Sequence, residues 1–123
     1  MESPNKSVAV LVVEDEDLVR SDMAATIEEA GFKVIEACSA DDAAMLFRNR
    51  ADIDLLFTDI EMPGAMDGLG LVRYARACSP EIKIIVTSGR RKPQSSDLPN
   101  GAVFLSKPCG PYRLIEQLET MTR

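Results

Sequence analysis

Five short apolar runs, separated by longer amphipathic segments, are the feature that most constrains the fold of this chain. The first run, residues 8–13, is continuous and rich in β-branched residues, as is typical of a strand buried on both faces. Strands are predicted at residues 8–13, 33–37, 55–58, 82–86 and 102–105, and helices at about 18–30, 40–48, 68–78 and 111–121. This alternation predicts a three-layer α/β domain, in which a five-stranded parallel sheet with right-handed crossovers lies between helices.

Capping residues mark the ends of the predicted helices. Gly31 follows the first helix as its C-terminal stop, and Ser39 and Asp67 are placed to cap the second and third helices. Pro80 ends the third helix, and Pro111 opens the last one near its first turn. Apolar residues at helical spacing predict the buried faces of the first helix (Leu18, Val19, Met23, Ile27, Ala30) and the last (Leu114, Ile115, Leu118, Met121).

The segment 90–100 breaks this pattern. It contains Pro93 and Pro99, which argue against a full helix, so we expect a loop with at most a turn or two. The basic cluster Arg90-Arg91-Lys92 at its start is expected to be a solvated loop.

Polar side chains stand where four of the predicted strands end. They are Glu14 and Asp15, then Asp59, then Thr87 and Ser88, and finally Lys107. Because the carboxyl ends of parallel strands face one crevice, we expect three carboxylates to crowd there, and they need a cation to stay ionised. Oxygen ligands alone favour a hard ion, by default Mg²⁺. With Lys107 and Thr87 as donors to phosphoryl oxygens, the set indicates phosphoryl transfer to an aspartate nucleophile.

Composition excludes several other classes of function. The chain has no histidine, which excludes histidine-based triads, histidine-ligated zinc and a phosphohistidine carrier. Its formal net charge of −6 disfavours nucleic acid and anionic membranes as direct partners. Three cysteines without a C-x-x-C motif suit a reducing cytoplasm, and no stretch is long and apolar enough for a membrane span.

The strand-end motifs together resemble the receiver domain of bacterial two-component response regulators. They are Val12-Val13-Glu14-Asp15-Glu16, Asp59 with Met62-Pro63-Gly64, Thr87-Ser88-Gly89 and Lys107-Pro108, and the resemblance spans about residues 8–121. It implies a flavodoxin-like sheet in the order 2-1-3-4-5. It also implies a phosphoprotein that catalyses only its own phosphorylation, from a histidine kinase phosphohistidine, and its own dephosphorylation.

The resemblance also assigns roles to single residues. Asp59 would be the phosphoacceptor. Mg²⁺ would be bound by Asp15, Asp59 and the main-chain carbonyl of Glu61, with Glu14 acting mainly through water. Lys107 would contact the phosphoryl group, and Thr87 and Phe104 would form the switch that responds to it. Glu61 and Gly89 are hypothesised to tune the phosphoryl lifetime by controlling access of water.

The chain departs from the receiver pattern at three places. Glu14 stands where Asp is commonest, and Ala65 lengthens the loop after Asp59 by one residue. The third is the proline-broken segment 90–100, which stands where receivers have a fourth helix that forms part of the signalling face, so that helix is expected to be short or broken. The longer loop and the sequence Val86-Thr87-Ser88-Gly89 resemble the corresponding segments of a group of alphaproteobacterial receivers.

Residues 1–123 are expected to form a single receiver domain without an attached output domain, acting as a monomer or weak dimer. Its partners would be a histidine kinase or histidine phosphotransfer protein and a downstream protein. A receiver excised from a hybrid kinase would have the same sequence features. Three other classes of protein compete with this interpretation. They are a haloacid-dehalogenase-like phosphatase, a phosphate-independent pseudo-receiver and a flavin-binding domain. The phosphatase also uses an Asp nucleophile that follows a strand. Repeated hydrolysis of phosphate esters would identify the phosphatase.

Overall fold

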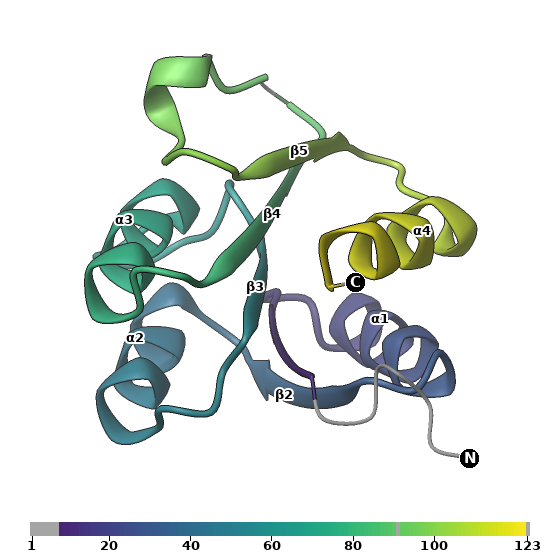
Figure 1. The fold of residues 1–123 in the computed structure, drawn as a ribbon. Coiled ribbons are helices and arrows are strands. Elements are labelled where there is room, and N and C mark those ends of the chain that lie inside the picture. Colours follow the sequence, from purple (N-terminus) through teal and green to yellow (C-terminus); the bar gives the residue numbers. More distant parts are fainter. Residues whose placement is uncertain (1–7, 91, 123) are drawn as a thin grey trace.

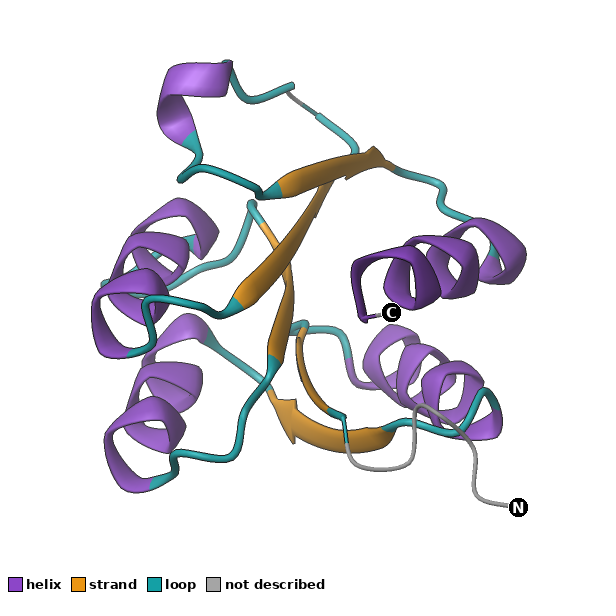
Figure 2. Cartoon of the chain, viewed as in Figure 1, coloured by secondary structure: helices purple, strands orange, loops and turns teal. Residues whose placement is uncertain are grey.

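The computed structural model describes residues 8–90 and 92–122 and contains a single parallel sheet (Figures 1 and 2). The strands are β1 (Ala9–Val13), β2 (Lys33–Ala37), β3 (Leu55–Asp59), β4 (Lys83–Ser88) and β5 (Val103–Ser106). The helices are α1 (Asp17–Glu29), α2 (Ala40–Asn49), α3 (Gly68–Cys78) and α4 (Pro111–Thr122), with a single 3₁₀ turn, η1 (Ser95–Asp97). The sheet order is β2-β1-β3-β4-β5, which confirms the predicted topology.

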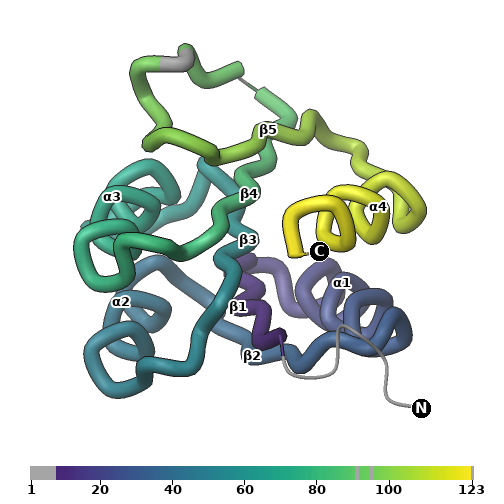
Figure 3. Tube along the Cα trace, viewed as in Figure 1, coloured from purple at the N-terminus to yellow at the C-terminus, as the bar shows by residue number. Residues whose placement is uncertain are grey.

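The sheet separates two apolar clusters. Figure 1 shows α2 and α3 on one face of the sheet and α1 and α4 on the other. Leu11 and Val13 of β1 pack with α2 and α3 on one face, whereas Val10 and Val12 pack with α1 and α4 on the other. This alternation follows from the two-residue period of a strand, and it leaves all five residues of β1 buried. The trace in Figure 3 shows β1 in the interior of the sheet, as its continuous apolar sequence predicts.

The predicted caps are confirmed at both helices for which they were inferred. The Ser39 hydroxyl accepts a hydrogen bond from the backbone N–H of Asp42 at 3.0 Å, and the Asp67 carboxylate accepts one from Gly70 at 2.8 Å. The bounds of β2 and α3 are as predicted, and those of the other strands and α-helices differ by at most two residues, because the last residue of an element depends on hydrogen bonds rather than on side-chain polarity.

One residue of the predicted core lies outside it. Leu18 leaves 82% of its surface exposed, although its spacing placed it on the apolar face of α1. It is the second residue of the helix, and its neighbour Val19 is half-buried, so the buried face of α1 begins after Leu18. Leu114 and Leu118 of α4 are buried as predicted, and Ile115 and Met121 are half-buried.

The connection between β4 and β5 has no α-helix within its described residues, only the turn η1, as the two prolines predicted (Figure 2). Arg76 of α3 holds the far end of this connection. Its guanidinium donates to the carbonyl of Asn100 at 2.9 Å and to that of Ile82 at 3.0 Å. In the described part of the chain, no helix is long and apolar enough to span a membrane.

Candidate functional site

Asp59 is the last residue of β3, the strand between β1 and β4, and its side chain is almost entirely buried. The backbone beyond it is held by hydrogen bonds from Ile60 N–H to the carbonyl of Thr87 (2.9 Å) and from Gly68 N–H to the carbonyl of Ile60 (3.1 Å). The Asp59 carboxylate accepts a hydrogen bond from the Glu61 N–H at 3.1 Å. These bonds fix the Asp59 carboxylate at the carboxyl edge of the sheet.

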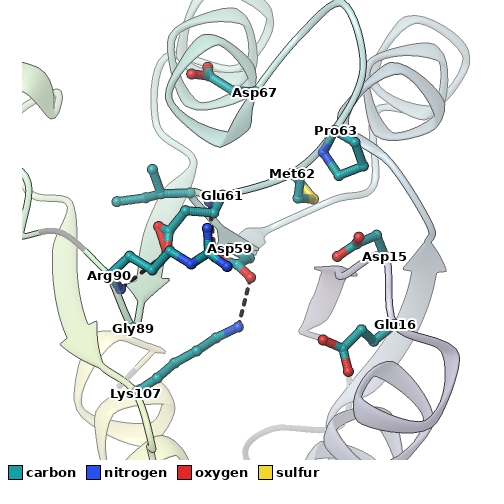
Figure 4. A pocket seen from close by; sticks show the side chains of 11 residues that line it. Asp15, Glu16, Asp59, Glu61, Met62, Pro63, Asp67, Gly89, Arg90 and Lys107 are labelled. Atoms are coloured by element: carbon teal, nitrogen blue, oxygen red, sulfur yellow. Dashed lines mark hydrogen bonds and ion pairs between the residues drawn. The ribbon is translucent and has the colours of Figure 1, made fainter.

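A cavity of about 630 Å³, the acceptor pocket, opens over Asp59 (Figure 4). It is lined by Asp15, Glu16, Asp59, Ile60, Glu61, Met62, Pro63, Asp67, Gly89, Arg90 and Lys107. Figure 4 shows Asp15 and Glu16 on one side of it and Arg90 and Lys107 on the other. The pocket is therefore built from the ends of β1, β3, β4 and β5, as predicted for a crevice at parallel strand ends.

Lys107 makes the central contact of the pocket. Its Nζ lies 2.7 Å from Oδ2 of Asp59 and 3.3 Å from Oε1 of Glu14 (Figure 4 shows the first pair). Burial lowers the pKa of Lys107, but the hydrogen bond and charge of Asp59, together with those of Glu14, outweigh burial and raise the pKa above its ordinary value. The ammonium group therefore stays charged while it contacts both carboxylates.

Glu14 lies below Lys107 with only 3% of its surface exposed. Burial is the main cause that raises the pKa of its carboxyl group. The hydrogen bond from Glu16 N–H at 3.0 Å and the charge of Lys107 lower the pKa, whereas the side-chain hydrogen bond with Asp15 and the negative charge of Asp59 raise it further. The longer Glu side chain reaches Lys107, so the departure from Asp at this position still delivers a carboxylate to the site.

The third predicted carboxylate, Asp15, lies next to Glu14, and a side-chain hydrogen bond between the two raises the pKa of Glu14. The Asp15 side chain is exposed and lines the far side of the pocket. Across residues 8–90 and 92–122, no three Asp, Glu, Cys or His side chains converge closely enough to hold a metal ion. The Lys107 ammonium contacts both Glu14 and Asp59 and neutralises part of their charge. The oxygen donors themselves, including Asp15 at the rim, are of the type that Mg²⁺ prefers.

The two predicted switch residues lie beside the pocket. Thr87 is buried and is the registered partner of Asp59 in the sheet, so both side chains leave the same face. Thr87 is not among the residues that line the acceptor pocket. Phe104 of β5 is half-buried, pairs with Val86 and packs against the α2–α3 side of the core.

Sequence reasoning missed two features of the site. The first is the side chain of Glu61, which accepts a hydrogen bond from the Ser88 hydroxyl and lies 3.3 Å from the Arg90 N–H. The second is Gly68, the first residue of α3, whose Cα faces the backbone of Asp59 without room for a side chain. A glycine directly after a capping Asp was a signal for such close packing. Arg90, expected only as part of a solvated loop, is exposed and also lines the pocket.

Comparisons with known proteins agree with this geometry. Residues 10–119 match the response regulator receiver domain family. The response regulator receiver protein CpdR of Brucella abortus is 32% identical, over 91% of this chain and 94% of CpdR. The sensor kinase CckA of the same species is 34% identical, but the chain spans only 12% of its length.

Solved receiver structures share the fold over nearly the whole chain. A response regulator receiver protein from Sinorhizobium medicae superposes with a TM-score of 0.90 at 28% identity, covering 95% of each chain. The receiver domain of the hybrid histidine kinase CckA superposes with a TM-score of 0.81 at 33% identity, covering 94% of this chain and 99% of that domain. The parallel sheet, the strand-end site and these relatives lead to one conclusion: the chain belongs to the receiver domain family of two-component response regulators.

Proposed function

We propose that Asp59 accepts a phosphoryl group from the phosphohistidine of a histidine kinase or histidine phosphotransfer protein. A carboxylate oxygen of Asp59 attacks phosphorus, the phosphorus–nitrogen bond to the imidazole breaks, and the imidazole leaves and takes up a proton. The product is an acyl phosphate. The observation that carries the proposal is the 2.7 Å contact between Asp59 and the Lys107 ammonium at the floor of an open pocket.

The chain's own groups can perform the parts of this reaction that need charge and position. Lys107 places a positive charge beside the acceptor oxygen, where the negative charge of the phosphoryl group arrives. The Glu61 N–H orients the other oxygen of Asp59. Glu14, Asp15, Asp59 and the Glu61 carbonyl would hold Mg²⁺, which when bound supplies further positive charge to the phosphoryl oxygens.

Two exposed apolar side chains support a protein as the phosphoryl donor. Leu18 and Tyr112, with 82% and 92% of their surfaces exposed, belong to the first turns of α1 and α4. These helices follow β1 and β5, so both turns lie at the edge of the sheet that carries Asp59. The kinase or phosphotransfer protein would dock there, and signalling would continue through a further protein partner. The same proposal includes a cytoplasmic location and a single receiver domain over residues 1–123. It also limits catalysis to self-phosphorylation and self-dephosphorylation.

The switch belongs to this proposal too. A phosphoryl group on Asp59 would attract the hydroxyl of Thr87, the registered neighbour on β4, and Phe104 would move inward as Thr87 shifts. Glu61, with Gly89 across the pocket, would control access of water to the acyl phosphate, because both line the cavity over Asp59. A dephosphorylation rate that stays unchanged in both Glu61→Gln and Gly89→Ala would contradict this role.

Intact-mass measurement after incubation with acetyl phosphate and Mg²⁺ tests the proposal. We expect one added phosphoryl group, which disappears in Asp59→Asn and in the presence of a chelator. Asp52→Asn is the matched control, because Asp52 is exposed and pairs with Arg50 away from the pocket. No adduct in the wild-type protein would contradict the proposal and favour a phosphate-independent module. Repeated hydrolysis of a phosphate ester would instead identify a phosphatase.

A further inference from the structure

A second cavity lies beside the acceptor pocket, over the ends of β4 and β5. Its volume is about 540 Å³, and it is lined by Ser88, Gly89, Arg90, Lys92, Phe104, Ser106, Lys107 and Arg113. It opens where the described part of the β4–β5 connection has only the turn η1, so that no α-helix of the described chain separates Phe104 from Arg90 and Lys92. We call this cavity the basic groove.

The charge of the basic groove is opposite to that of the whole chain. Four of its eight lining residues are Lys or Arg and none is acidic, although the chain carries a formal net charge of −6. Lys107 is already paired with Asp59 and Glu14. In the part of the chain that the structure describes, Arg90, Lys92 and Arg113 form no ion pair. Figure 4 shows the Arg90 side chain extending into the acceptor pocket, so Lys92 and Arg113 are the two cations left to the basic groove, and a bound anion would relieve their mutual repulsion.

The remaining lining of the groove indicates what kind of anion fits. Phe104 contributes a half-buried aromatic ring, and Ser88 and Ser106 contribute hydroxyl groups. A hollow with an apolar ring and a rim of cations fits a short peptide that carries carboxylates beside an apolar side chain. A long polyanion such as nucleic acid needs an extended basic surface, and the net charge of −6 outside this hollow opposes one.

We propose that the basic groove binds an acidic segment of a partner protein, with its carboxylates paired to Lys92 and Arg113 and an apolar side chain against Phe104. The groove shares Gly89, Arg90 and Lys107 with the acceptor pocket. A phosphoryl group on Asp59 brings a further negative charge to this shared wall, so occupancy of either cavity changes affinity at the other by the same factor. Only this coupling rests on the proposed phosphorylation of Asp59; binding in the groove does not.

Fluorescence anisotropy with a labelled peptide tests the proposal on the full chain. The probe is a peptide of about twelve residues that contains glutamates and two phenylalanines, and a second peptide has glutamine at every glutamate. We expect saturable binding of the acidic peptide alone. Replacing two cations, Lys92→Gln with Arg113→Gln, should weaken it by about tenfold, since each exposed ion pair contributes a factor of a few.

The matched control removes the same charge elsewhere. Lys33→Gln with Arg73→Gln replaces two exposed cations outside the groove and should leave the affinity unchanged. Asp59→Asn should also still bind the acidic peptide, which separates failure of the groove from failure of phosphorylation. The proposal is overturned by absence of saturable binding, by equal losses in the two double variants, or by equal affinity for the glutamine peptide. Tighter binding of single-stranded DNA or of phosphatidylserine vesicles through Lys92 and Arg113 would also overturn it.

Discussion

Gly68 offers a direct test of how α3 is packed against the acceptor. A Cβ atom at this position would lie 2.1 Å from the carbonyl oxygen of Asp59, 2.7 Å from Cα of Ile60 and 2.9 Å from the carbonyl carbon of Asp59. All three are backbone atoms, so no side chain can rotate away to make room. The φ angle of Gly68 is not positive, and the demand for glycine here is therefore one of space alone.

The magnitude of the Gly68→Ala effect follows from these distances. Either the first turn of α3 or the backbone of Asp59 must move by roughly 1 Å, and adding a methyl group to a packed core costs about 1–3 kcal/mol. Because the contact is with backbone on a central strand, we expect the upper end, about 3 kcal/mol. That is a large fraction of the total stability of about 5–15 kcal/mol of a typical small domain.

Urea unfolding of Gly68→Ala, followed by circular dichroism, measures this loss. Gly110→Ala is the matched control, because a Cβ at Gly110 meets nothing within 4 Å and should change the free energy of unfolding by no more than about 0.5 kcal/mol. We also expect phosphorylation of Gly68→Ala by acetyl phosphate to be slower, since the displaced backbone carries the acceptor. If Gly68→Ala unfolds at the same urea concentration as Gly110→Ala, the close packing of α3 on Asp59 is wrong.

Three further substitutions have defined expectations. Lys107→Met should slow phosphorylation by acetyl phosphate by about 10²-fold, as expected for loss of a charge at the reacting group, whereas Lys83→Met, on an exposed side chain, should not. Ser39→Ala removes the cap of α2 and should lower the free energy of unfolding in urea by about 1 kcal/mol; no shift of the midpoint would contradict the cap. The Cys38 thiol donates a hydrogen bond to the Asp42 carboxylate at 2.8 Å, and this bond raises the pKa of the thiol. Asp42→Ala should therefore lower that pKa and increase the thiolate fraction, which moves the pH profile of Cys38 alkylation to lower pH. An unchanged alkylation profile, measured by mass spectrometry, would show that the carboxylate does not act on the thiol.

The fold could be predicted because the local signals are strong and independent of one another. The run at β1 is apolar throughout, which only a strand covered on both faces explains, and the structure buries all of it. Ser39 and Asp67 cap the helices that they were predicted to cap. Pro93 and Pro99 prevent a regular helix after β4, and the described residues of that connection contain one 3₁₀ turn.

The details of the site could be predicted only in part, because strand ends fix where a residue lies but not which way its side chain turns. Glu14 and Asp59 both turn toward Lys107, whereas Asp15, adjacent to Glu14, turns to the exposed rim. Periodicity likewise placed Leu18 on the apolar face of α1, yet its side chain is exposed while that of Val19 beside it is half-buried. Contacts between distant parts of the chain decide these outcomes, and a one-dimensional pattern does not contain them.

Gly89 shows how the acceptor pocket and the basic groove are connected. A Cβ at this position would lie 3.5 Å from Cβ and 3.9 Å from Cδ of Lys107, which is ordinary van der Waals contact, so packing does not demand a glycine there. The φ angle of Gly89 is not positive, so the backbone does not demand one either. Gly89 and Lys107 both line the two cavities, so the Lys107 side chain is shared between them. Any event that draws the Lys107 ammonium away from Glu14 and toward a new negative charge on Asp59 must therefore also reshape the basic groove.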